Sequence, residues 1–410
     1  GRQDLLDRYL EASAPVGEIE SQLAGLQTGS AARQEAVERL RSAHEQLDVV
    51  LSDIRKVGGF AEFPRPGFPP AEELSRLPAP LVFLIPGFQQ GAAIRVYGDG
   101  TLEPVALPDA AEDALSERVG AWRQAAARWD GSSRDGGAWA REVADMGRWL
   151  WTVAMDAVAD LLSGADEAIL VPCGDFVDLP LHAAWRSDGD GRRYLIDDMV
   201  VRYAPSLRAA LDKGRRVSDV GATTLLTVVD ETLTWAPGEV AAVASSFGED
   251  KSKGLVKSAT TRRELLAALP HVDVVHFACH GKADPINPLA GALFACRDAP
   301  VTLADISTQD LAATRLVTLS ACESAVSDPR LINEVVNLAT GFLEAGSVGA
   351  IGSLWTVNDQ RTGALMERTY QHWKTEGLHP AQALAAAQRE MRGGIDGEPI
   401  YWAPFVYMGA

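Results

Sequence analysis

The hydrophobic pattern from residue 168 to the C-terminus alternates between short apolar runs and stretches with helical periodicity. Apolar runs of strand length lie at 168–172, 199–203, 224–229, 272–277, 291–295, 316–319, 348–352 and 405–408. Helical periodicity fills 238–247, 260–269, 331–346, 359–376 and 380–392. Strands that alternate with helices are typical of a largely parallel sheet. The pattern therefore predicts an α/β fold, in which functional residues gather at the carboxyl ends of the strands.

The first 163 residues follow other patterns. Residues 1–57 predict a helical arm, because steps of three and four place five apolar residues on one stripe, with His44 as a packed helix residue between two of them: Val37, Leu40, Leu47, Leu51 and Ile54. Residues 58–80 are rich in glycine and proline and predict a linker. Two apolar runs around Asp99-Gly100 predict a β-hairpin, and residues 109–163 return to helical periodicity.

Composition narrows the classes of partner. The 38 basic and 56 acidic residues give a net charge of −18, which disfavours nucleic acid as a partner. The apolar runs fall short of the ~18 residues of a membrane-spanning helix, so no membrane partner is expected. Four scattered cysteines do not resemble a disulfide framework, so a reducing cytoplasm is the expected location. No secretory signal opens the chain, and its start at Gly1 is expected of a fragment.

A histidine stands at the end of one predicted strand. The run from Val274 ends at His280, and Gly281 permits the chain to turn there. Because side chains alternate along a strand, His276 and His280 share one face while Cys279 points to the other. His280 lies at the rim, where a side chain can reach a substrate. His276 lies deeper and is expected to be a hydrogen-bonded core residue, and Cys279 a small core residue.

A cysteine follows the next such strand. The run from Leu316 leads through Ser320 to Cys322, 42 residues after His280, which leaves room for one strand and a short helical connection. The two strand ends are therefore predicted to be neighbours. A thiol needs a nearby base to become a nucleophilic thiolate. Backbone N–H groups of Gly281 and Cys322 would then bind the developing oxyanion.

Spacing alone leaves other interpretations open. His280 and Cys322 are equally compatible with two unrelated core residues. A metal site of His276, His280 and Cys322 is a weaker rival, because the two histidines lie about 13 Å apart along an extended strand. A nucleotide-binding loop from Gly346 to Gly352 is excluded, because this run precedes a strand and phosphate loops follow one.

The sequence resembles CHAT-domain proteins, the bacterial branch of the caspase and separase peptidase clan. The resemblance extends over about residues 80–410 and rests on the order and spacing of motifs rather than on one of them. The motifs are Val171–Gly174, Leu179–Trp185, Tyr194–Ile196, Tyr203–Leu207, His276–Gly281, Asp284–Leu289, Leu319–Ala325, Asn333-Glu334 with Leu338, Phe342 and Ala345-Gly346, Gly352–Asp359, Ala383-Leu384 with Ala387-Gln388, and Tyr401–Phe405.

The resemblance implies a caspase-like α/β sandwich with a pseudo-protease half at 81–215 and a catalytic half at 216–410. It implies that His280 is the base and Cys322 the nucleophile, and this chemistry needs no metal or organic cofactor. The arm at 1–57 fits the end of the helical repeat array that often precedes this domain in relatives. Some relatives act in bacterial defence or conflict systems, where they cut a partner protein after a trigger is sensed.

Three positions bear on how far the resemblance extends. Cys173 stands where relatives have an acidic or polar residue, but it lies in the pseudo-protease half. Ser320 is a candidate for the substrate pocket and is neutral where metacaspase-like relatives place an acid. Asp359 is a second candidate, because it resembles part of a separase loop that contributes to a pocket for basic side chains. The alternative for Asp359 is the N-cap of a helix at 360–376.

The sequence therefore predicts a caspase-like cysteine endopeptidase that cleaves a protein partner and is latent until a helical arm, protein or ligand orders the active-site loops. A defence or cell-death pathway is the expected setting. The alternative is a non-catalytic CHAT interaction module in a signalling complex. A third hypothesis is an acyl transferase that uses the same dyad of His280 and Cys322.

Overall fold

The structure is a computed structural model. It describes residues 5, 8–9, 11–16, 19, 22, 31–57, 68–129, 131, 136–189, 191–214, 224–284, 287–320, 337–394 and 397–409. The chain divides into two compact units, the first made of residues 1–70 with 330–332 and the second of the remaining residues. Among the described residues, no helix combines the length and the apolar character that a membrane crossing needs.

The first unit contains one long helix, α2 (Ala31–Arg55). Leu51 and Ile54 of the predicted apolar stripe are buried in it. Ala36 and Ala43 on the same helix pack with Ile19 in a small apolar cluster. The side chain of His44 lies outside the described residues. The amphipathic pattern thus accounts for which face of α2 is covered within this unit.

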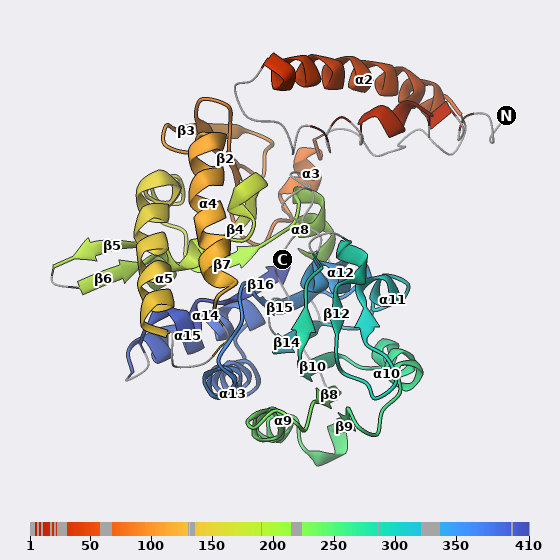
Figure 1. Cartoon of the computed structure of the whole chain (residues 1–410), viewed down its shortest axis with the longest axis vertical. Helices are drawn as coiled ribbons and strands as arrows, with labels where there is room; N and C mark the ends of the chain where they lie inside the picture. Colours follow the sequence, from red (N-terminus) through yellow and green to blue (C-terminus); the bar gives the residue numbers. More distant parts are fainter. Residues whose placement is uncertain are drawn as a thin grey trace. The chain divides into compact units, whose positions relative to one another are not determined.

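The second unit is built on one sheet of eleven strands in the order β3-β2-β1-β4-β7-β16-β15-β14-β10-β8-β9 (Figure 1). Its strands in chain order are β1 (Leu81–Ile85), β2 (Gly91–Val96), β3 (Leu102–Leu107), β4 (Glu167–Pro172), β7 (Val200–Tyr203), β8 (Leu225–Val229), β9 (Ser252–Val256), β10 (Val274–Ala278), β14 (Leu316–Ser320), β15 (Gly349–Ser353) and β16 (Phe405–Gly409).

The strand directions match the α/β prediction. β1–β2, β2–β3 and β15–β16 pair antiparallel, and the other neighbours in the sheet pair in parallel. β2 and β3 form the hairpin expected around Asp99-Gly100, where Gly100 has a φ of 90°. The mixed α/β fold with a largely parallel sheet is therefore confirmed.

Helices cover both faces of the part of the sheet after residue 224. On β10, His276 faces Tyr370 of α13 (Asp359–Glu376) and Glu239 of α9 (Ala236–Ser245). Phe277, the next residue of β10, faces the opposite way and packs on Phe342 of α12 (Leu338–Glu344). The alternation of a strand thus assigns α9 and α13 to one face and α12 to the other.

The part before residue 214 repeats this arrangement. Leu81 of β1 belongs to a buried cluster with residues of α3 (Ala71–Leu74) and α8 (Leu207–Gly214). Its neighbour Val82 belongs to the main core with residues of α4 (Glu112–Ala126) and α5 (Gly136–Leu150). α3 lies within the stretch expected as a linker, and its Leu74 is buried.

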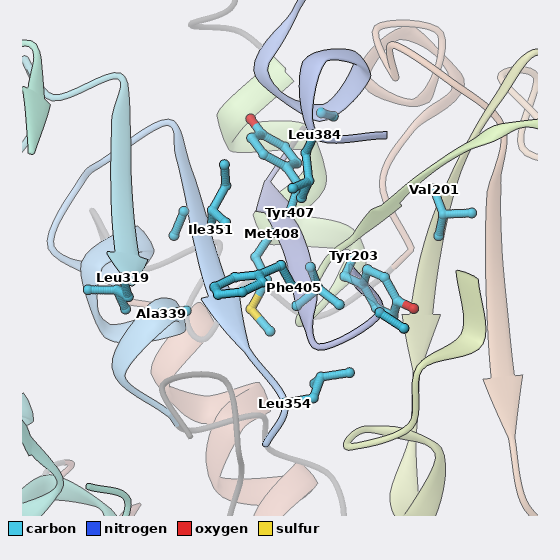
Figure 2. Close-up of a cluster of buried hydrophobic side chains, with 14 of the residues drawn as sticks. Val201, Tyr203, Leu319, Ala339, Ile351, Leu354, Leu384, Phe405, Tyr407 and Met408 are labelled. Carbon is cyan, nitrogen blue, oxygen red and sulfur yellow. The ribbon is translucent and has the colours of Figure 1, made fainter. Parts of the chain in front are cut away.

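The two parts of the second unit share one core. β7 from the first part pairs in parallel with β16 from the second, with Tyr203 opposite Met408. Figure 2 shows labelled side chains of β7, β15 and β16 together in one buried cluster. Strand pairing and apolar packing therefore both continue across the junction between residues 214 and 224.

Further elements complete the second unit. Two small sheets are formed by β5 (Trp185–Asp188) with β6 (Gly191–Tyr194), and by β11 (Gly281–Lys282), β12 (Ala292–Leu293) and β13 (Val301–Thr302). The remaining longer helices are α10 (Arg262–Ala268) and α14 (Pro380–Arg392). Short helical segments lie at α6 (Asp156–Leu161), α7 (Leu195–Asp198), α11 (Leu303–Ser307) and α15 (Pro399–Trp402), with a π-helical segment, η1, at Trp151–Met155.

Candidate functional site

The candidate site lies where the parallel strands β8, β10 and β14 end. β10 pairs with β14 and with β8, so that Ala278 lies opposite Ser320 on one side and Val229 on the other. The prediction that the two strand ends are neighbours is confirmed up to Ser320. Cys322, the predicted nucleophile, lies outside the described residues.

His280 stands just beyond β10 and is exposed. The next residue, Gly281, opens β11 and pairs with Leu293 of the small sheet. The backbone oxygen of His280 accepts a hydrogen bond from the Phe294 N–H at 2.8 Å. The chain thus leaves the large sheet and enters the small one at His280, which fixes its backbone while the imidazole faces solvent.

His276 is buried, as predicted for a hydrogen-bonded core residue. Its Nε2 lies 2.8 Å from Glu239 Oε1, and its Nδ1 lies 3.3 Å from the Tyr370 hydroxyl. Cys279 is 2% exposed, as expected of a small core residue. With both ring nitrogens of His276 engaged, the metal interpretation loses one of its ligands, and the described residues hold no metal-binding cluster of His, Cys, Asp and Glu.

Asp359 is the first residue of α13 but not its cap. Asn358 is the N-cap, and its Oδ1 accepts from the Arg361 N–H at 3.2 Å. The alternative that Asp359 caps a helix at 360–376 is therefore wrong, because α13 already begins at Asp359, as the helical periodicity at 359–376 indicated. Asp359 Oδ2 instead accepts from the backbone N–H of Trp235 at 3.1 Å. Trp235 precedes α9 and is 48% exposed.

The charge state of Asp359 depends on several neighbours. Burial raises the pKa of this half-buried carboxyl group, and the nearby Glu239 carboxylate raises it further. The Trp235 N–H and the His280 imidazole lower the pKa, but the net shift is upward. The influence of His280 places its ring within electrostatic range of Asp359.

The loop before α13 is held by the first part of the unit. Trp355 is 2% exposed, and its ring packs edge-on against Trp122 and Trp139 with centroids 5.6 and 5.8 Å away. The Trp129 Nε1–H donates to the Thr356 carbonyl at 2.7 Å. The Asn358 amide donates to the Gly131 carbonyl at 3.0 Å. Residues from α4, α5 and their connection thus fix the backbone that leads into Asp359.

Two other cysteines are poor nucleophiles. Burial raises the pKa of the Cys173 thiol to about 11. Burial, with a contribution from Asp298, raises the pKa of the Cys296 thiol to about 11. Both side chains therefore remain almost entirely as thiols near neutral pH.

Ser320, the predicted pocket residue, is the last residue of β14 and is only 8% exposed.

Sequence reasoning missed three residues at or below this rim: Asp230, Trp235 and Glu239. The backbone N–H of Asp230 bonds Ala278 O at 2.9 Å, and its buried carboxylate lies 2.6 Å from Lys257 Nζ. The strand-end rule would have found Asp230, because it follows the apolar run at 224–229. No local signal marks Glu239, whose partner His276 is 37 residues away.

Comparisons with known proteins agree with this architecture. The family model of the CHAT domain matches residues 144–410. Two structures of the Saccharomyces cerevisiae separase–securin complex match at 10% identity, with TM-scores of 0.59 and 0.53 and 91% of this chain covered. They are covered to 34% and 32%, so the chain spans about a third of the separase it matches. The Arg-specific cysteine proteinase gingipain R matches with a TM-score of 0.42 at 11% identity, over 73% of this chain and 74% of that one. A search of curated proteins finds no match.

Proposed function

Because the chain belongs to the CHAT-domain family, whose model matches residues 144–410, we propose that it is a cysteine endopeptidase with His280 and Cys322 as its catalytic dyad. The parallel pairing of β10 with β14 carries the proposal. This pairing brings the ends of β10 and β14 to one edge of the sheet, where the chain lies two residues before His280 and two residues before Cys322 in the sequence. The separase-like fold supports a cysteine peptidase over unrelated chemistry on the same sheet.

In the proposed reaction, His280 takes the proton of the Cys322 thiol and the thiolate attacks a peptide carbonyl. The N–H groups of Gly281 and Cys322 bind the oxyanion. His280 then returns the proton to the leaving amine, and a water molecule hydrolyses the thioester to release the acid and the free thiol. The exposure of His280 suits it to exchange protons with thiol, amine and water in turn.

Asp359 is proposed to line the pocket for the side chain that precedes the cleaved bond. Its carboxylate is half-buried at the rim and within electrostatic range of His280. A buried carboxylate favours a basic side chain, because charge-assisted hydrogen bonds are strong in such a site. Ser320 is proposed to contribute a small, neutral wall beside it. The proposed substrate is thus a protein cut after lysine or arginine.

Regulation by a partner belongs to the same proposal. The separase structures contain securin as a protein partner. In this chain, the helical arm with α2 is proposed to receive an activating protein or ligand. A cytoplasmic defence or cell-death role would follow from cleavage of a partner protein after such activation.

Labelling with peptidyl acyloxymethyl ketones tests the proposed enzyme. The wild type should react with a probe that carries arginine or lysine before the ketone, and peptide mapping should place the adduct on Cys322. The raised pKa values of Cys173 and Cys296 keep both thiols unreactive near neutral pH. Cys173→Ser should therefore label at the wild-type rate.

The probe assay is run with and without lysate from the source cells. An adduct that forms only with lysate would indicate a latent enzyme that needs an activator. If no adduct forms on Cys322 under either condition, the peptidase proposal fails, and a non-catalytic interaction module becomes the better description.

Asp359→Asn should separate specificity from stability. Burial raises the pKa of Asp359 in the folded protein above its ordinary value of 3.8. The free energy of unfolding therefore falls as the pH rises from 3.8 through the raised pKa, because the carboxyl group has to ionise in a half-buried place. Asparagine keeps the acceptor for Trp235 and removes the charge. The variant should therefore melt at or above the wild-type temperature near neutral pH, with the difference shrinking toward about pH 4.

The same variant should lose about tenfold to a hundredfold in reactivity toward the basic probe and little toward a neutral probe. Calorimetry at several pH values and parallel probe kinetics measure the two effects. Equal losses toward basic and neutral probes would remove Asp359 from the proposed pocket.

A further inference from the structure

A continuous chain of buried polar groups crosses four elements beneath the rim. Glu239 of α9 contacts His276 of β10 at 2.8 Å, and His276 contacts Tyr370 of α13 at 3.3 Å. The Tyr370 hydroxyl contacts Thr318 Oγ1 of β14 at 2.9 Å. His276, Thr318 and Tyr370 are 0% exposed, and Glu239 is 4% exposed.

The protons of this chain can be arranged in one consistent direction. Thr318 donates to Tyr370, Tyr370 donates to His276 Nδ1, and His276 Nε2–H donates to Glu239. Burial raises the pKa of Tyr370 well above its ordinary range, so the phenol keeps its proton. Glu239 lies in the first turn of α9, and its Oε1 is the partner of His276 Nε2. The three contacts of this chain can therefore all form only while α9, β10, α13 and β14 keep their relative positions.

The same four elements also lead to the rim. From His276 the chain runs through the end of β10 to His280, and β14 continues from Thr318 to its last residue, Ser320. α13 begins with Asp359, whose carboxylate binds the N–H of Trp235 just before α9.

Between the rim and the buried chain, α9 and α13 touch closely. A Cβ added to Gly363 of α13 would lie 3.5 Å from the Cβ of Glu239. The two helices are thus joined at the rim by Asp359 and in the interior around Glu239.

We propose that Glu239, His276 and Tyr370 are positioning residues that hold His280 and Asp359 in one geometry at the rim. This inference rests on the proposed peptidase function, because it assigns the buried chain a purpose in that reaction. Apolar side chains of the same volume would fill the space but would not hold β10 and β14 against a shift along each other. The polar chain holds them, because the Tyr370 hydroxyl contacts both His276 and Thr318, which lie opposite each other in the sheet register.

Tyr370→Phe tests the proposal, because it removes one hydroxyl and leaves the ring in place. The first part of the second unit, before residue 214, supplies a matched control in Tyr203, which is 3% exposed and whose hydroxyl lies 2.9 Å from the buried His182 Nδ1. Both substitutions remove a buried phenol hydroxyl with two contacts. The Tyr370 hydroxyl contacts His276 and Thr318, and the Tyr203 hydroxyl contacts Nδ1 and accepts from the backbone N–H of His182. Tyr203→Phe should therefore lower the melting temperature comparably and leave the rate of Cys322 alkylation unchanged.

The expected result is an about tenfold or larger drop in the maximal alkylation rate of Tyr370→Phe, with probe affinity within about twofold of wild type, because small misplacements of reacting groups mainly slow the chemical step. Rates are compared at a temperature where both variants are fully folded. A wild-type rate for Tyr370→Phe, or an equal drop for Tyr203→Phe, would overturn the proposal.

A second readout does not depend on activity. The His280 ring signals in a ¹H–¹³C spectrum, assigned with His280→Gln, should shift in Tyr370→Phe and stay fixed in Tyr203→Phe. Failure of the peptidase proposal would show as an unlabelled wild type, whatever the spectrum. Failure of the positioning proposal would show as an unchanged His280 signal in Tyr370→Phe.

Discussion

His280→Ala should slow Cys322-dependent alkylation and peptide cleavage by about 100-fold or more, while the protein stays folded. His280 is exposed, so its removal leaves no cavity and costs little stability. The loss would fall on the maximal rate, because probe contacts with Asp359 remain. Added imidazole should restore part of the rate, since the position of the lost base is open to solvent.

His271→Ala is the matched control for this loss. His271 is also exposed and stands before the same strand, β10, at its opposite end. It should react at the wild-type rate. A small effect of His280→Ala, or no response to imidazole together with an equal loss in His271→Ala, would refute the role of His280 as the base.

Trp355→Ala should lower the free energy of unfolding by about 3–5 kcal/mol, as is typical for a buried tryptophan. Its ring is 2% exposed and packs on Trp122 and Trp139 of the first part. Because Trp355 anchors the loop that leads into Asp359, the variant should also bind basic probes about tenfold more weakly. Urea unfolding and probe titrations measure the two effects.

Trp402→Ala separates stability from binding. Trp402 is 0% exposed, and its ring packs edge-on against Tyr194 with centroids 5.1 Å apart, whereas the ring of Trp355 packs on Trp122 and Trp139. The two variants should lose comparable stability, but only Trp355→Ala should lose affinity for the basic probe. A similar affinity loss in both would mean that the first part supports the pocket only through general stability.

Local pattern and strand geometry were enough to predict the rim. The apolar runs that end at Ala278 and Ser320 have the length and alternation of strands, and the parallel rule then placed their ends side by side. His276 was assigned to the interior by its depth along the strand, and Cys279 was expected to be a small core residue; both are buried. These predictions depend on neighbours in the sequence, which is why a single sequence carries them.

Other features depend on contacts between distant residues. The contact of Glu239 with His276 and the hydrogen bond from Trp129 to the Thr356 carbonyl form only after the helices have packed. The edge strand β9 was missed because its residues are largely exposed and include a glycine, so neither a continuous apolar run nor a clean alternation marks it. The periodicity at 359–376 matched α13, but Asp359 as an alternative N-cap was wrong, because Asn358 and Asp359 are both good capping types and only the Arg361 contact decides between them.

The place of β16 in the sheet sets an order of assembly during synthesis. β16 is the last strand of the sheet along the chain, yet it lies between β7 and β15 in the middle of the sheet. All five of its residues are buried. A nascent chain that has not yet released residues 405–409 therefore has two separate half-sheets with open inner edges. The two half-sheets can join into one sheet only after residues 405–409 have been made, because β16 is the strand that pairs with both of them.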